Sequence, residues 1–149
     1  MHLDDLVEQF CAATLPHAEW THTAHLRVGA WHVYHFGAGG ALDRLRCGIR
    51  RLNESHGTPN SETRGYHETI TVAYVRLIDA FLAEAGAQTP LQDRVALLLA
   101  SPLADRRVLT TFWTPELLLS PRARAEWVEP NAAPLELARI GGGPILNLE

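Results

Sequence analysis

Two segments of this chain carry imidazole and carboxylate groups at the point where a loop leads into a helical pattern. The first contains His22 and His25, and the second contains the adjacent pair His67 and Glu68. Both side-chain types transfer protons near neutral pH, and both bind divalent metal ions. Backbone N–H groups at a helix N-terminus add a favourable place for an anion or a carbonyl oxygen. If the two helices lie side by side, we expect these four side chains to line one polar pocket.

The spacing within each segment limits how its side chains can act together. His22 and His25 are three residues apart, so a helix places them on one face. Buried histidines that only satisfy hydrogen bonds are the alternative interpretation of this pair. His67 and Glu68 are neighbours, which on a helix point about 100° apart, so only one would face a pocket unless the site lies at the helix end. Glu68 also suits the first turn of a helix, where a carboxylate complements the dipole.

A polar loop precedes His67 and is long enough to reach over such a pocket. Its residues 57–65 are rich in the types that form turns, and turn formation alone is the alternative explanation for them. Trp127, further along the chain, is a candidate lid over the pocket, and packing in the core is the alternative explanation for this side chain. We predict that the substrate is held by Asn60, Thr63, Arg64, Tyr66 and Trp127.

The elements that must position these groups are helices. Apolar residues recur at three- and four-residue steps through most of the chain, and no segment alternates as a strand does. Thr21, Thr89, Thr114 and Ser120 are predicted helix N-caps, the last three because proline follows them. The pattern predicts helices over residues 3–14, 21–36, 41–56, 66–86 and 90–100.

The predicted fold class is all-α. We expect residues 1–149 to form a single-domain bundle of four or five helices, with its core over about 20–128. Three prolines and a Gly141–Gly143 run predict an irregular C-terminal arm over about 129–149. The helix over 21–36 is apolar nearly all round and is therefore expected to be central. A second subunit could cover it in place of the same chain, which leaves a homodimer open.

Composition excludes several classes of function. The chain has 149 residues, a hydrophobic content of 46% and a net charge of −4, so we expect no nucleic-acid-binding surface. No apolar run reaches the roughly 18 residues needed to cross a bilayer. The acidic N-terminal sequence is unlike a signal peptide, which predicts a cytoplasmic protein without a membrane association. All 13 basic residues are arginine, so lysine Schiff-base chemistry is excluded. Dinucleotide, P-loop and nucleophile-elbow motifs are also missing.

The motifs together resemble a family of small all-helical bacterial proteins of about this length. The resemblance covers roughly residues 20–135, implies that the blocks belong to one fold, and carries no particular activity. A weaker similarity is to small cyclodehydratases of natural-product pathways, and it favours elimination of water among acid–base reactions. The matching blocks are Trp20-Thr21-His22-x-x-His25-Leu26, Arg50-Arg51-Leu52-Asn53-x-x-His56-Gly57-x-x-Asn60, Thr63-x-Gly65-Tyr66-His67-Glu68-Thr69-Ile70-Thr71 and Leu119-Ser120-Pro121-x-Ala123-Arg124-x-x-Trp127-Val128-Glu129-Pro130.

Three functions follow from the sequence as hypotheses. The leading one is a small-molecule acid–base enzyme, a dehydratase or cyclodehydratase-type lyase, with Glu68 as general base and His67 or His22 as general acid. In that hypothesis His25 orients or polarises a carbonyl group. The second is a metal-dependent hydrolase or lyase in which His22, His25 and His67 bind Zn²⁺ or Fe²⁺. The third is a non-catalytic ligand-binding or interaction module, and no cofactor is required by the first or the third.

Overall fold

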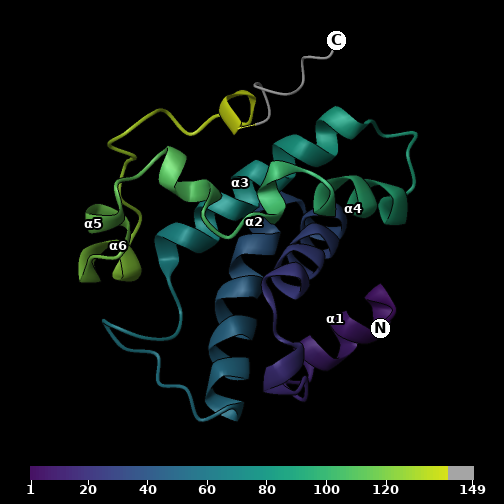
Figure 1. Cartoon of the computed structure of the whole chain (residues 1–149). Coiled ribbons are helices and arrows are strands. Elements are labelled where there is room, and N and C mark those ends of the chain that lie inside the picture. Colours follow the sequence, from purple (N-terminus) through teal and green to yellow (C-terminus); the bar gives the residue numbers. More distant parts are fainter. Residues whose placement is uncertain (141–149) are drawn as a thin grey trace.

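The structure is a computed structural model that describes residues 1–140, so the predicted Gly141–Gly143 run lies outside the described residues (Figure 1). It is all-α, as predicted, and residues 1–140 contain no strand. No helix in this range is long and apolar enough to cross a membrane. The helices are α1 (Leu3–Cys11), α2 (His22–Ser55), α3 (Glu68–Ala85), α4 (Leu91–Leu99), α5 (Pro115–Leu118) and α6 (Pro121–Ala125), with 3₁₀ turns η1 (His17–Glu19), η2 (Pro102–Ala104) and η3 (Val108–Thr111).

Helix α2 contains two arms that the sequence predicted as separate helices. The helical backbone is broken at Gly37 alone, where φ is 71° and ψ is 172°. A positive φ is strained for other residues and free for glycine, which explains the break at this position. The predicted four-residue gap over 37–40 is wrong, because Gly39 and Gly40 continue in helical conformation.

Most of the capping residues predicted from the sequence lie at the ends of helices. Thr89 is the exception, because its hydroxyl donates to the carbonyl of Ala85, and Pro90 occupies the cap position of α4 without a side-chain hydrogen bond. Helix α3 ends at Gly86, whose φ of 94° suits only glycine. The N-caps confirmed by a hydrogen bond from the backbone are Thr21, Thr114 and Ser120.

The core forms where α2 packs against α3, α1 and α4. The segment after Pro102 completes it, because Trp113 is fully buried and its indole N–H donates to the carbonyl of Val128. Hydrogen bonds to a backbone carbonyl also hold the start of the predicted C-terminal arm, since the amides of Ala132 and Ala133 both donate to the carbonyl of Phe112. Several apolar residues between 133 and 140 also pack against the core. The described part of the arm therefore lies along the bundle.

A close contact between α1 and α2 gives a first testable prediction. A Cβ added at Gly48 would lie 2.6 Å from the ring of Phe10, which is buried and stacked on Trp20. Gly48→Ala is therefore expected to lower the free energy of unfolding by about 1–3 kcal/mol, as overpacking does. Gly39→Ala is the matched control, because a Cβ there meets no atom within 4 Å and alanine favours a helix. Chemical denaturation measures both, and equal stability of the two variants would contradict the contact.

Candidate active site

A cavity of about 510 Å³ lies between the two arms of α2, the first half of α3 and the segment around η3. This volume is typical of small-molecule sites, which run from roughly 300 to 1,000 Å³. Eight of its lining residues are aliphatic and seven carry polar side chains. It is lined by Trp20, Thr21, His22, His25, Leu26, Gly29, Leu45, Ile49, Ile70, Thr71, Tyr74, Val75, Ile78, Arg106, Leu109, Thr110 and Leu118.

His22 is held in one tautomer by a backbone carbonyl. Its Nε2 lies 3.2 Å from the carbonyl oxygen of Leu103, in η2. A carbonyl oxygen can only accept, so Nε2 carries the hydrogen and the neutral ring has its lone pair on Nδ1. The ring also meets that of Tyr74 edge-on, with 5.5 Å between the centroids. His22 therefore offers Nδ1 for proton transfer beside a phenol group.

His25 is held in the opposite tautomer. Its Nδ1 donates to the carbonyl of Thr21 at 2.6 Å, which leaves the lone pair on Nε2. The ring is stacked on Trp20 with 3.7 Å between centroids, and Trp20 is stacked in turn on Phe10 of α1. Solvent reaches the ring, but the surrounding protein still desolvates it, and this lowers the pKa of His25 below its ordinary value. The neighbouring charges of His22 and Arg106 lower it further, while the bond to Thr21 opposes the shift.

Tyr74 contributes a neutral hydroxyl group to the cavity wall. Burial, together with the negative charge of Asp105, raises the pKa of Tyr74 to about 12. Thr71 also lines the cavity, but its hydroxyl donates to the carbonyl of His67 at 2.8 Å. The cavity thus combines two imidazoles, each with one ring nitrogen bound to a backbone carbonyl and the other unoccupied, and a phenol that stays protonated at neutral pH.

His67 does not line this cavity, contrary to the prediction of a shared pocket. It is buried as the N-cap of α3, where Nδ1 accepts from the amide of Ile70 at 3.2 Å. Its Nε2 donates to the carbonyl of Leu118 at 2.7 Å. Burial lowers the pKa of His67, and the charge of Arg124 adds to this effect. Both ring nitrogens are occupied, so His67 joins α3 to α5 and is not placed for chemistry.

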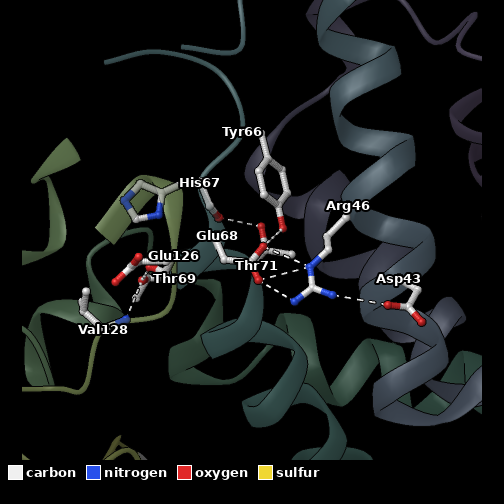
Figure 2. Close-up of polar contacts among 9 residues, drawn as sticks. All are labelled: Asp43, Arg46, Tyr66, His67, Glu68, Thr69, Thr71, Glu126 and Val128. Atoms are coloured by element: carbon white, nitrogen blue, oxygen red, sulfur yellow. Dashed lines mark hydrogen bonds and ion pairs between the residues drawn. The ribbon is translucent and has the colours of Figure 1, made fainter. Parts of the chain in front are cut away.

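Glu68 is also outside the cavity, in an ion pair with α2. Figure 2 shows the side chains of Arg46 and Tyr66 directed at its carboxylate, while the ring of His67 points to the other side. Arg46 donates through Nε and Nη2, and the hydroxyl of Tyr66 donates at 2.6 Å. Burial alone would raise the pKa of Glu68, but the hydrogen bonds from Arg46 and Tyr66 outweigh it and lower the pKa. The role of Glu68 as general base in this cavity is therefore not supported by its position.

The loop residues predicted to bind substrate organise the loop itself. The Oδ1 atom of Asn60 accepts from the side chain of Asn53 and from the amide of Tyr66, and its Nδ2 donates to the carbonyl of Arg50. Tyr66 is buried, with Arg50 over its ring and its hydroxyl on Glu68. Thr63 and Arg64 are exposed and do not line the cavity.

Trp127 lies away from the cavity as well. Its ring packs edge-on against Trp113 at 5.5 Å between centroids, and Arg76 lies over its face. The indole N–H donates to Glu129 at 2.8 Å. These contacts make Trp127 a packing residue, which was the alternative explanation of this side chain.

The structure does not assemble the predicted metal ligands. In residues 1–140, no three histidine, cysteine, aspartate or glutamate side chains converge as a metal site would require. His22 and His25 line the cavity, but both nitrogens of His67 are engaged elsewhere. The described residues therefore do not bring His22, His25 and His67 together as a ligand set.

Three cavity residues were not singled out from the sequence: Tyr74, Arg106 and Thr110. Tyr74 lies four positions after Ile70, on the apolar face of α3. A hydroxyl-bearing residue on an apolar face is the signal in the sequence that could have identified Tyr74 as a site residue. Arg106 and Thr110 lie in a segment without helical periodicity, about eighty residues beyond His22. Their position depends on long-range packing that no local pattern encodes.

Comparison of the chain with known proteins finds no matching family model, no similar curated protein and no similar solved structure. The family resemblance stated from the motifs therefore remains a prediction. What is established for this chain is an all-α fold with a cavity between α2 and α3 that contains His22 and His25.

Proposed function

We propose that this chain is a small-molecule enzyme that uses acid–base chemistry, a lyase of the dehydratase or cyclodehydratase type. The observation that carries the proposal is the pair of histidines in the cavity. Each has one ring nitrogen bound to a backbone carbonyl and the other available, His22 through Nδ1 and His25 through Nε2. Fixed tautomers of this kind are what a positioned acid and base require.

In the proposed reaction a β-hydroxy carbonyl compound loses water. Nε2 of His25 takes the proton from the carbon next to the carbonyl group, and the electron pair of that C–H bond forms the new double bond. The C–O bond at the β-carbon breaks, and the hydroxyl group leaves as water with a proton from Nδ1 of protonated His22. A proton then passes through solvent from His25 to His22, which restores both groups.

Ring closure uses the same two proton transfers. An internal nucleophile of the substrate attacks the carbon that bears the hydroxyl group, and His25 takes the proton of that nucleophile. The hydroxyl group again leaves as water with a proton from His22. The aliphatic walls support both versions, because they offer contacts to the hydrocarbon part of such a substrate.

The lowered pKa of His25 supports its assignment as the base. A base must be unprotonated before the reaction, and desolvation together with the neighbouring charges keeps His25 neutral at pH 7. His22 is the residue next to it on the same face of α2, and it contacts the neutral hydroxyl-bearing ring of Tyr74. This division of roles replaces the one predicted from the sequence, in which Glu68 was the base.

The proposal is tested by a mass-spectrometric screen for loss of water from β-hydroxy carbonyl compounds. Thr110 is exposed and lines the cavity, whereas its neighbour Thr111 is exposed and does not. Thr110→Trp is therefore expected to block the cavity and reduce product formation to background. Thr111→Trp adds the same indole one residue away and should retain wild-type activity. A screen without any product, or an active Thr110→Trp variant, would overturn the proposal.

A further inference from the structure

Arg106 is a cavity-lining cation without an acidic partner among residues 1–140. Asp105, its neighbour, is already engaged: its carboxylate accepts from the amide of Arg107 at 2.8 Å and from the Arg107 guanidinium at 3.5 Å. No hydrogen bond to another side chain or to the backbone fixes Arg106 within the described residues. Its five N–H donors are thus available to a ligand in the cavity.

Arg106 shares the cavity wall with His22, His25 and Tyr74. Its charge acts on the ring of His25, and the charge of Asp105 raises the pKa of Tyr74. His22 and Tyr74 are in direct contact. Much of the remaining wall is aliphatic, from Leu26, Leu45, Ile49, Val75, Ile78 and Leu109.

We infer that the cavity binds a small, largely apolar monocarboxylate, with its carboxylate on Arg106 and its hydrocarbon part against the aliphatic walls. The inference rests on the proposed function, since Arg106 lines the same cavity as the proposed base His25. A guanidinium matches a carboxylate through two parallel hydrogen bonds, which fixes the orientation of the ligand as well as its affinity.

The charge balance at the cavity favours a carboxylate over a phosphate ester. Arg106 is the one arginine in the cavity lining, and the carboxylate of Asp105 lies next to it in the chain. A phosphate group carries up to two negative charges at neutral pH, which this pair would not compensate. A singly charged anion with an apolar body fits both the charge and the walls.

The test measures binding and does not depend on turnover. Hexanoate, octanoate and hydrocinnamate, each beside its neutral carboxamide, are titrated by calorimetry into the wild type, Arg106→Gln and Arg122→Gln. The two variants remove the same charge at exposed positions, and only Arg106 lines the cavity. At least one carboxylate is expected to bind the wild type about tenfold or more tightly than Arg106→Gln. Arg122→Gln should bind it as the wild type does, and the carboxamide should bind all three proteins alike.

Three results would overturn the inference. They are equal weakening by the two variants, no weakening by either, and no binding of any of the three carboxylates to the wild type. Failure of the proposed function has a different signature. If carboxylates bind through Arg106 and no β-hydroxy acid loses water, the inferred ligand class holds and the enzymatic proposal is wrong. If a neutral compound is dehydrated equally by the wild type and Arg106→Gln, the enzymatic proposal holds and the inferred ligand class is wrong.

Discussion

His25→Gln is expected to slow the proposed dehydration by roughly 100- to 10,000-fold, the usual contribution of a positioned general base. Nε2 of His25 is the unprotonated nitrogen aimed for this role, because Nδ1 donates to the carbonyl of Thr21. Glutamine preserves a polar side chain of similar size but cannot take the proton. The ring of His25 is exposed to solvent in the cavity, so the thermal unfolding temperature should change little.

The pH dependence of kcat/KM checks the same assignment. The base acts when it is unprotonated, so activity falls as the pH drops through the pKa of His25 in the free enzyme. Because desolvation lowers this pKa, the acid limb is expected below the ordinary histidine value of about 6.5. His35→Gln is the control, since His35 is an exposed histidine of α2 that does not line the cavity. A fully active His25→Gln variant would show that His25 is not the base.

His67→Ala is expected to lower the free energy of unfolding by about 2–4 kcal/mol. The change removes the N-cap of α3, worth roughly 1 kcal/mol, and leaves the buried carbonyl of Leu118 without its donor, worth about 1–3 kcal/mol. For a chain of this length such a loss corresponds to a decrease of roughly 5–15 °C in the unfolding temperature. Catalytic turnover by the folded fraction should stay close to that of the wild type, since His67 lies outside the cavity.

His2→Ala provides the control for this prediction. His2 occupies the N-cap position of α1 but makes no side-chain cap hydrogen bond, and it is exposed. Its replacement should therefore change the free energy of unfolding by less than about 0.5 kcal/mol. His67→Asn separates the two contributions, because asparagine can cap Ile70 but is too short to donate to Leu118. A His67→Ala variant as stable as His2→Ala would contradict the structural role of His67.

The helices could be predicted from the sequence because their determinants are local. Thr21 caps α2 through a hydrogen bond that spans three residues, and Gly86 ends α3 through its own backbone conformation. At Gly37 the sequence located the break but overestimated its length. Gly39 and Gly40 remain helical, because a glycine in a helix costs only about 1 kcal/mol, which the packing of neighbouring helices can offset.

The candidate site could be predicted only in part. The three-residue spacing placed His22 and His25 on one face of α2, and both line the cavity. His67 and Glu68 lie at the helix end, where first-turn side chains can converge, but they point to different sides of the α3 N-terminus. His67 is the N-cap and has an extended backbone, so helical spacing does not set its direction. Arg46 and Leu118 supply better partners to Glu68 and His67 than the cavity does.

The remaining features of the site depend on distant segments. Backbone carbonyls of Leu103 and Thr21 fix the two tautomers, and a carbonyl acceptor has no signature in side-chain patterns. Arg106 reaches the cavity from an irregular segment whose path follows from the burial of Trp113 and the residues around it. Such placement is decided by tertiary packing, so inspection of one sequence does not reveal it.

The most direct test of the central claim is a long-range ¹H–¹⁵N NMR spectrum of the histidine side chains, recorded with and without the dehydrated product. Spectra of the variants His22→Gln, His25→Gln and His67→Gln assign the signals, because each variant lacks the resonances of one histidine. Our account predicts opposite tautomers for the neutral forms of His22 and His25, and product-induced shifts at both rings with none at His67. Shifts at His67 with unchanged signals from His22 and His25 would contradict the assignment of this cavity as the active site.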